Sequence, residues 1–146
     1  MLAPPRAERY ESPGPTAIVL PSFFSSPKSR SVVGVEALLR WRDPERGIIP
    51  PNDFIPLAEE TGLMLPIGTW VLETACRQAI EWNSGGGGDV RMAVNISPRQ
   101  FEQQDIVGLV RRSLNETDLP AHLLEIEITE SMAIQNPEHT IALLKG

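Results

Sequence analysis

The sequence predicts an α/β fold in which parallel strands alternate with helices and form part of a barrel. From about residue 31, short strand-like segments alternate with longer segments that have helical periodicity. Three strand-like segments, 33–41, 90–97 and 124–131, also have one polar and one apolar face and carry oxygen-bearing side chains. A polar face repeated on three strands suggests a barrel whose mouth holds a cation.

Composition sets limits on the class of protein. The chain has 146 residues, 41% hydrophobic content and a net charge of −6, which fits one domain and argues against binding a nucleic acid polymer. A single cysteine, Cys76, excludes an internal disulfide and fits a reducing compartment. No apolar run approaches the roughly 18 residues of a membrane span, and the first residues lack a secretory signal. We therefore expect a cytoplasmic protein without a membrane segment.

The chain divides at about residue 31. Residues 1–30 are rich in proline and serine, which argues against a helix or a central strand, so we expect this segment to be mostly disordered. Its apolar patch, 17–20, is long enough only for a brief strand. The second segment, 31–146, contains the predicted domain.

The first half of that domain begins with the strand at 33–41, which ends before Asp43-Pro44. A short helix opens at Pro51-Asn52-Asp53 and is closed by Gly62. A longer helix covers about 67–83, with an apolar stripe for docking on the sheet. The stripe consists of Trp70, Val71, Thr74, Cys76, Ile80 and Trp82.

The second half starts after a run of four glycines, 85–88, which we interpret as a flexible connector. The run lacks the Lys-Ser/Thr of a phosphate loop and precedes a strand. After the strand at 90–97 we predict a helix over 101–115, then the strand at 124–131. A last helix is expected from Asn136-Pro137 onward.

Side-chain alternation places the candidate functional residues on the polar faces of the three strands. Glu36, Leu38 and Arg40 share a face of the first strand. Asn95 shares a face of the second with Arg91, Ala93 and Ser97, and Glu127 shares a face of the third with Glu125 and Thr129.

Four ordered segments resemble the signatures of one family, the EAL domain, which comprises bacterial phosphodiesterases for cyclic di-GMP. The segments are Val35-Glu36-Ala37-Leu38-Leu39-Arg40-Trp41, Phe54-Ile55-Pro56-Leu57-Ala58-Glu59, Val94-Asn95-Ile96-Ser97 and Glu127-Ile128-Thr129-Glu130-Ser131. The resemblance covers about residues 32–146. It implies a variant TIM-like (β/α) barrel with its site at the C-terminal mouth of the strands.

The resemblance also implies roles for individual residues. Glu36, Asn95 and Glu127 match the metal ligands, and such oxygen donors suit Mg²⁺ or Mn²⁺. Arg40, with Leu38 beside it, matches the residues that contact the substrate, and Glu130 matches a glutamate that steadies a neighbouring loop. The implied reaction is metal-assisted hydrolysis of one phosphodiester bond of cyclic di-GMP, which gives a linear dinucleotide.

Simpler interpretations of the same residues remain open. Glu36 can be an ordinary strand-end carboxylate paired with Arg40, which then acts only as a counter-ion. Asn95 can cap the turn at Ser97-Pro98, and Glu127 can belong to a solvated acidic edge. Cys76 fits a small core residue better than a nucleophile.

The chain ends before the segments of the family that carry an Asp-Asp pair, a lysine and a further glutamate, and its first 30 residues show no likeness to the family's opening strand. A TIM barrel takes about 250 residues, so we expect about half of an EAL domain. Its exposed strand edges invite self-association. We expect weak metal binding and no hydrolysis by this chain alone. The alternatives are a non-catalytic module that binds cyclic di-GMP or a protein, and a truncated product without its own function.

Overall fold

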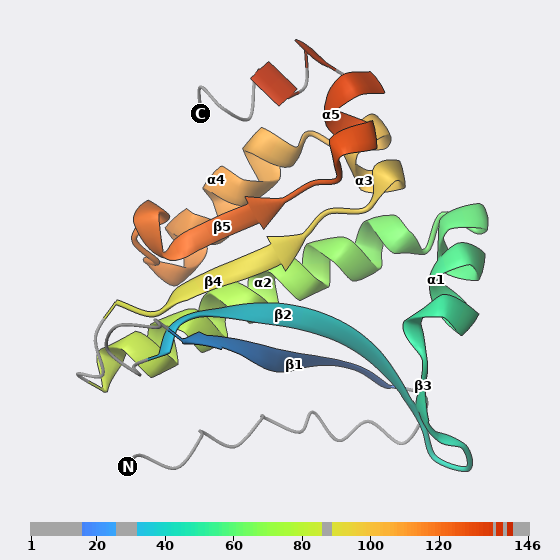
Figure 1. Cartoon of the computed structure of the whole chain (residues 1–146), viewed down its shortest axis with the longest axis horizontal. Helices are drawn as coiled ribbons and strands as arrows, with labels where there is room; N and C mark the ends of the chain where they lie inside the picture. Colours follow the sequence, from blue (N-terminus) through green and yellow to red (C-terminus); the bar gives the residue numbers. More distant parts are fainter. Residues whose placement is uncertain (1–15, 26–31, 86–88, 136, 139, 142–146) are drawn as a thin grey trace.

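The structure is a computed structural model that describes residues 16–25, 32–85, 89–135, 137–138 and 140–141. Its strands form one sheet in the order β1-β2-β4-β5, with the short β3 paired to the end of β2 (Figure 1). The strands are β1 (Thr16–Ser25), β2 (Val32–Asp43), β3 (Gly47–Ile49), β4 (Arg91–Asn95) and β5 (Leu124–Glu127). The helices are α1 (Pro51–Glu60), α2 (Met64–Ser84), α3 (Pro98–Gln103), α4 (Ile106–Thr117) and α5 (Glu130–Gln135), with a 3₁₀ turn at Ala121–Leu123.

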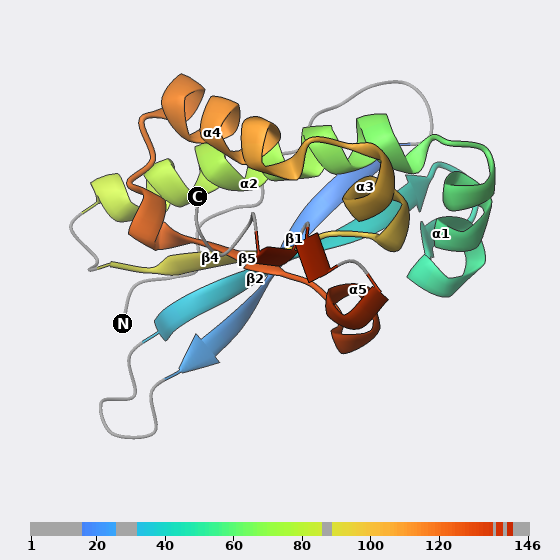
Figure 2. The same cartoon turned by 90° about the horizontal axis from the view of Figure 1, so that it is seen from above.

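Strands β2, β4 and β5 are parallel, as the alternation of strands and helices predicts. The long helices α2 and α4 lie together on one face of the sheet (Figure 2). Helices α1, α3 and α5 gather at the end of the sheet to which these three strands point. This arrangement confirms the α/β fold class. Among the described residues, no long helix covers the opposite face of the sheet.

The expected disorder of residues 1–30 is wrong for residues 16–25, which form β1. This strand pairs with β2 in an antiparallel register from Thr16↔Arg42 to Ser25↔Val32. Its proline, Pro21, is tolerated because β1 has a partner on one side only and ends the strand order. The remaining residues of that segment, 1–15 and 26–30, lie outside the described residues.

The core lies between the sheet and α2, and the apolar strand faces supply it as predicted. Val35, Met92 and Val94 are each 1% exposed. From α2, the fully buried side chains are Leu72, Ala75 and Cys76. In the predicted stripe, Val71 and Cys76 are buried, and Trp70, Ile80 and Trp82 pack against the core as partly buried side chains. The prediction omits Leu72, Ala75 and Ala79. Burial raises the pKa of the Cys76 thiol to about 11, which fits the predicted core role.

The helix predicted over 101–115 is in fact two helices, α3 and α4. Gln104 between them has extended backbone angles (φ −116°, ψ 147°). Asp105 then starts α4 by accepting a hydrogen bond from the Gly108 backbone N–H at 3.0 Å. The periodicity of apolar residues continues across this break and therefore does not reveal it. Two polar residues, Gln104 and Asp105, create the break.

The third strand is shorter than the predicted 124–131, because β5 ends at Glu127 and Glu130 begins α5. The helix expected from Asn136-Pro137 falls largely on residues 136, 139 and 142–146, which lie outside the described residues. The glycines 86–88 of the expected connector do so as well. Among the described residues, no helix is long and apolar enough to cross a membrane.

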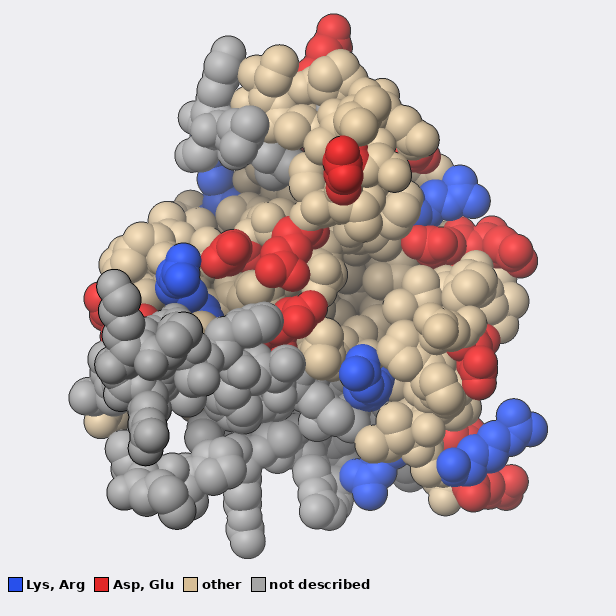
Figure 3. All heavy atoms as spheres, viewed as in Figure 1, with Lys and Arg blue, Asp and Glu red and all other residues tan. Residues whose placement is uncertain are grey.

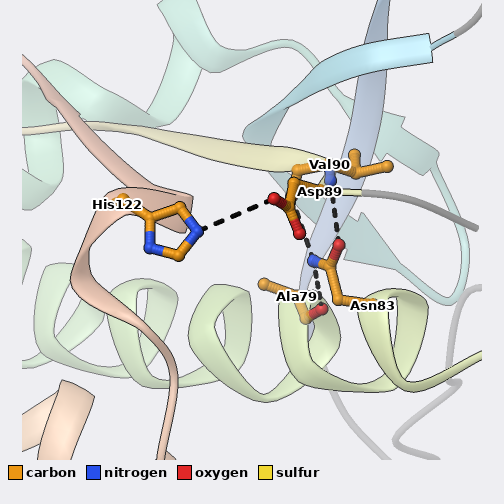
Figure 4. Close-up of polar contacts among 5 residues, drawn as sticks. All are labelled: Ala79, Asn83, Asp89, Val90 and His122. Carbon is orange, nitrogen blue, oxygen red and sulfur yellow. Dashed lines mark hydrogen bonds and ion pairs between the residues drawn. The ribbon is translucent and has the colours of Figure 1, made fainter. Parts of the chain in front are cut away.

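One asparagine ties the end of α2 to the start of the next strand. Asn83 donates from Nδ2 to the Ala79 carbonyl at 2.8 Å and to the Val90 carbonyl at 3.0 Å, and its Oδ1 accepts from the Val90 N–H at 2.8 Å (Figure 4). The side chain thus pairs with Val90 as a neighbouring strand would. Asp89 and His122 lie beside it, 3.9 Å apart and well exposed, so their ion pair adds little.

Replacing Leu72 by alanine should lower the free energy of unfolding by about 3 kcal/mol, because the side chain is fully buried between α2 and the sheet. Leu57→Ala is the matched control, since Leu57 is also helical but 56% exposed, and should change stability by less than about 0.5 kcal/mol. Urea denaturation measures both. Equal losses would contradict the location of the core described above.

Candidate metal and phosphodiester site

The parallel register brings the three predicted metal ligands to one face of the sheet. Glu36 pairs in register with Ala93 of β4, and Asn95, two residues further along β4, pairs with Glu127 of β5. Since residues two apart on a strand share a face, Glu36, Asn95 and Glu127 point to the same side. This is the face opposite the buried side chains of Val35 and Val94.

A direct hydrogen bond joins the first two of these residues. The Asn95 Nδ2 donates to Glu36 Oε1 at 2.6 Å, across the gap between β4 and β2. The two side chains are separated by 59 positions in the sequence. The side chains of Glu36 and Asn95 therefore do come together, as the sequence predicts. Asn95 and Glu127 are the last residues of β4 and β5, whereas Glu36 lies within β2, which continues to Asp43.

The third residue, Glu127, has an unfavourable electrostatic environment. Partial burial raises the pKa of its carboxyl above the ordinary value, and the negative charges of Glu36 and Glu125 raise it further. Acidic side chains gather over β4 and β5 on the face without long helices (Figure 3). Arg91 offsets this negative charge only weakly. Its Nη1 lies 3.6 Å from Glu125 Oε2, and both side chains are more than half exposed.

Arg40 lies further along β2 on the same face as Glu36 and is partly buried. Its Nη1 donates to the Leu39 carbonyl at 2.8 Å, which leaves guanidinium donors over. In the part of the chain that the structure describes, the ion pairs join Arg91 to Glu125 and His122 to Asp89. The simpler interpretation of Glu36 as the partner of Arg40 is therefore not what the structure shows. Leu38, between them on this face, is half-buried.

Glu130 follows the end of β5 by three residues. It is the exposed first residue of α5 rather than a strand residue. Thr129, just before it, accepts from the Met132 N–H through Oγ1 at 3.4 Å, and its carbonyl accepts from the Ala133 N–H at 3.2 Å. The loop between β5 and α5 is thus held at its helical end, close to Glu130.

The donor set fits a hard divalent cation in part. Two carboxylates and one amide supply oxygen ligands of the kind that Mg²⁺ and Mn²⁺ prefer. A cation would relieve the repulsion from Glu36 and Glu125, which adds to the effect of burial in raising the Glu127 pKa. Asn95 would bind through Oδ1, so its amide would have to rotate away from the present bond with Glu36. Among the described residues, no group of three or more His, Cys, Asp or Glu side chains could hold a metal.

Sequence reasoning missed the side chains that hold the turn after β4. Ser97 and Gln100 form a capping box at the start of α3, and Gln100 is fully buried. The Ser-x-x-Gln spacing was the available signal, because it marks a helix start.

Fold and candidate site together define an α/β domain in which parallel strands carry grouped polar side chains on one face and long helices on the other. The model of the EAL domain family matches residues 24–146, and the chain belongs to this family. The match begins before the predicted boundary at residue 31, so the end of the first segment belongs to the domain.

The relatives whose names state an activity include two proteins from different bacteria. The chain is 46% identical over 115 residues to the bifunctional diguanylate cyclase/cyclic di-GMP phosphodiesterase MucR of Pseudomonas aeruginosa, covering 78% of this chain and 17% of MucR. It is 42% identical over 114 residues to the cyclic di-GMP phosphodiesterase PdeR of Escherichia coli, covering 78% of this chain and 17% of PdeR.

Among solved structures, the MucR phosphodiesterase in complex with cyclic di-GMP superposes with a TM-score of 0.83 at 40% identity. The match covers 88% of this chain and 52% of the MucR chain in that structure. The chain therefore spans about half of the solved domain and a smaller part of the curated relatives.

Neutralising Glu127 should stabilise the metal-free fold at neutral pH. The folded state keeps the Glu127 proton to a higher pH than the unfolded chain does, so stability falls as pH rises through this range. Glu127→Gln should raise the melting temperature at pH 7 by up to about 4 °C, corresponding to about 1 kcal/mol or less at this partly exposed site, and the gain should vanish below about pH 4.

Glu45→Gln is the control for this prediction, because Glu45 lies in the exposed turn between β2 and β3. It should show no such pH-dependent gain. Thermal melts at pH 4 and pH 7 decide the matter. If the Glu127→Gln protein is less stable than the parent at pH 7 without metal, the prediction that the charged Glu127 side chain destabilises the metal-free fold is wrong.

Proposed function

We propose that this chain supplies the first part of a metal-dependent cyclic di-GMP phosphodiesterase site. The observation that carries the proposal is the placement of Glu36, Asn95 and Glu127 on one face of three parallel strands, with Asn95 hydrogen-bonded to Glu36 and in register with Glu127. Relatives named as cyclic di-GMP phosphodiesterases, and a solved relative in complex with cyclic di-GMP, support the substrate class. A single, buried cysteine is consistent with the cytoplasm as its compartment.

Each residue has a role in this proposal. Glu36, Asn95 and Glu127 would hold Mg²⁺ or Mn²⁺, and the ion would supply Lewis-acid stabilisation of the phosphoryl oxygens and a lower pKa for the attacking water. The free guanidinium donors of Arg40 orient a phosphate oxygen, with Leu38 against the substrate beside it. Glu130 steadies the loop from β5 to α5. The product is a linear dinucleotide, because water cleaves one phosphodiester bond of the ring.

The described residues hold only part of such a site. Three oxygen donors would supply only part of the ligands that a hard divalent cation takes, and the chain spans about half of the solved MucR phosphodiesterase chain. We propose that residues 1–146 alone bind the metal weakly and do not turn over cyclic di-GMP.

A non-catalytic interaction module is the second candidate, favoured by the strand order. β5 ends the order of the described sheet, with β4 as its neighbour, so its other edge has backbone groups available for pairing. Self-association through this edge would appear as concentration-dependent oligomers in sedimentation. Weak binding of cyclic di-GMP without turnover, measured by calorimetry, would fit the same candidate.

A chimera tests whether these residues support catalysis. The matching half of the MucR phosphodiesterase domain is replaced by residues 16–146 of this chain. The two chains are 40% identical over the 88% of this chain that the solved structure matches. We expect Mn²⁺-dependent hydrolysis by the chimera and none by the isolated chain. Glu36→Gln should lower the chimera's turnover at least about 100-fold, because it removes a charged metal ligand.

Glu45→Gln in the same chimera should leave turnover unchanged, since the exposed turn lies beyond the end of β2 that carries Arg40. Hydrolysis by the isolated chain that disappears in Glu36→Gln would contradict the need for the second half. A folded, Mn²⁺-binding chimera in which Glu36→Gln retains full turnover would overturn the proposed role of the site.

A further inference from the structure

We propose that the buried side chain of Gln100 is a positioning residue for Asn95, because it fastens the turn that follows β4 to a glycine of α2. The inference rests on the proposed function, in which Asn95 is a metal ligand. It adds to that function a residue that contacts neither metal nor substrate. Three observations carry it: the hydrogen bonds of Gln100, its seat on α2, and the short path from Ser97 to Asn95.

Gln100 has no solvent exposure, and an amide without water must find its partners within the protein. Its Oε1 accepts from the Ser97 backbone N–H at 3.3 Å, and its Nε2 donates to Gln104 Oε1 at 3.3 Å. The Gln100 backbone N–H in turn donates to Ser97 Oγ at 3.2 Å. Ser97 is therefore bound to Gln100 through both its backbone and its side chain.

The second glutamine extends this connection to α2. Gln104 Nε2 donates to Thr69 Oγ1 at 3.0 Å and to the Leu65 carbonyl at 3.4 Å. Thr69 Oγ1 donates to the same Leu65 carbonyl at 3.1 Å. An unbroken series of hydrogen bonds thus runs from Ser97, through two glutamine amides, to the first turns of the longest helix.

Gly68 supplies the space for the Gln100 amide. A Cβ at position 68 would overlap the Gln100 amide group, so the glutamine lies directly against the helix backbone. A glycine inside a helix costs about 1 kcal/mol relative to alanine. The close approach of the amide gives that glycine a structural purpose.

Only Ile96 separates Ser97 from Asn95. Its side chain is 4% exposed and its N–H donates to the Glu127 carbonyl at 2.9 Å. Asn95 is therefore the last residue of β4 on one side and adjoins an immobilised turn on the other, while its own side chain is exposed and reaches Glu36. An exposed ligand held on a fixed backbone needs less ordering when it binds a cation.

Gln100→Met tests the role of the hydrogen bonds, because methionine keeps about the length and volume of the side chain and lacks the amide carbonyl and NH₂ groups. In the full 146-residue chain, we expect faster hydrogen exchange at the Ser97 amide and Mn²⁺ binding about 10-fold weaker, measured by electron paramagnetic resonance. Asn95→Ala serves as the reference for complete loss of the ligand.

A size exchange separates positioning from packing. Gly68→Ala alone should displace Gln100 and impair both folding and metal binding, whereas in Gly68→Ala/Gln100→Ala the new methyl group occupies the space of the lost amide. The double variant should regain the melting temperature lost in Gly68→Ala, yet its Mn²⁺ binding should stay about 10-fold weak. This variant also keeps the test valid should either single variant fail to fold.

Asp105→Ala is the matched control, because it removes the cap of the next helix and should lower stability without reaching the turn at Ser97. Its Mn²⁺ affinity should equal that of the parent. Parental affinity in Gln100→Met or in the double variant, when Asn95→Ala weakens binding, overturns the role of Gln100 alone. Parental affinity in Asn95→Ala overturns the proposed metal site and this inference with it.

Discussion

The parallel register of β2, β4 and β5 is the constraint on which the candidate site depends. A shift of one residue in either strand pair would turn every side chain of the shifted strand to the opposite face. Glu36 or Glu127 would then enter the apolar layer under α2 and α4, where an unpaired carboxylate is very costly. The buried side chains of Val35, Met92 and Val94 exclude that shift, so the packed face determines the geometry of the polar one.

Because one face of the sheet is apolar and packed, the other face tolerates an unfavourable cluster of charges. Glu127 experiences the negative charges of Glu36 and Glu125 on a face where Arg91 gives only exposed, distant compensation. The free-energy cost of this repulsion is small compared with the stabilisation from apolar burial on the opposite face. Burying one core leucine stabilises the fold about as much as several surface charge pairs. The fold can therefore hold carboxylates together without a cation, and we propose that the cation relieves the repulsion when it binds.

Much of the fold could be predicted because its signals are local and periodic. Alternation located β2 and β4, and it correctly assigned the buried faces around Val35 and Val94. The errors lie where a local polar interaction or a distant partner decides the structure. The cap at Asp105 divides one predicted helix into two, and β1 exists because β2 offers it a partner along its whole length. Hydrophobic periodicity reveals neither of these features, and it does not reveal that β5 ends at Glu127.

The candidate site could be located but not explained from the sequence. Spacing and the family resemblance placed Glu36, Asn95 and Glu127 together, and the register and the hydrogen bond between Asn95 and Glu36 agree with that placement. Residue spacing could not show that the turn after Asn95 packs on α2 through Gln100 and Gly68. These two residues belong to different helices, and neither carries a charge. A buried amide whose every group has a partner favours one arrangement of its surroundings over near alternatives. We therefore propose that the position of the exposed Asn95 side chain depends on the covered layer beneath it, where hydrogen bonds are not weakened by competing water.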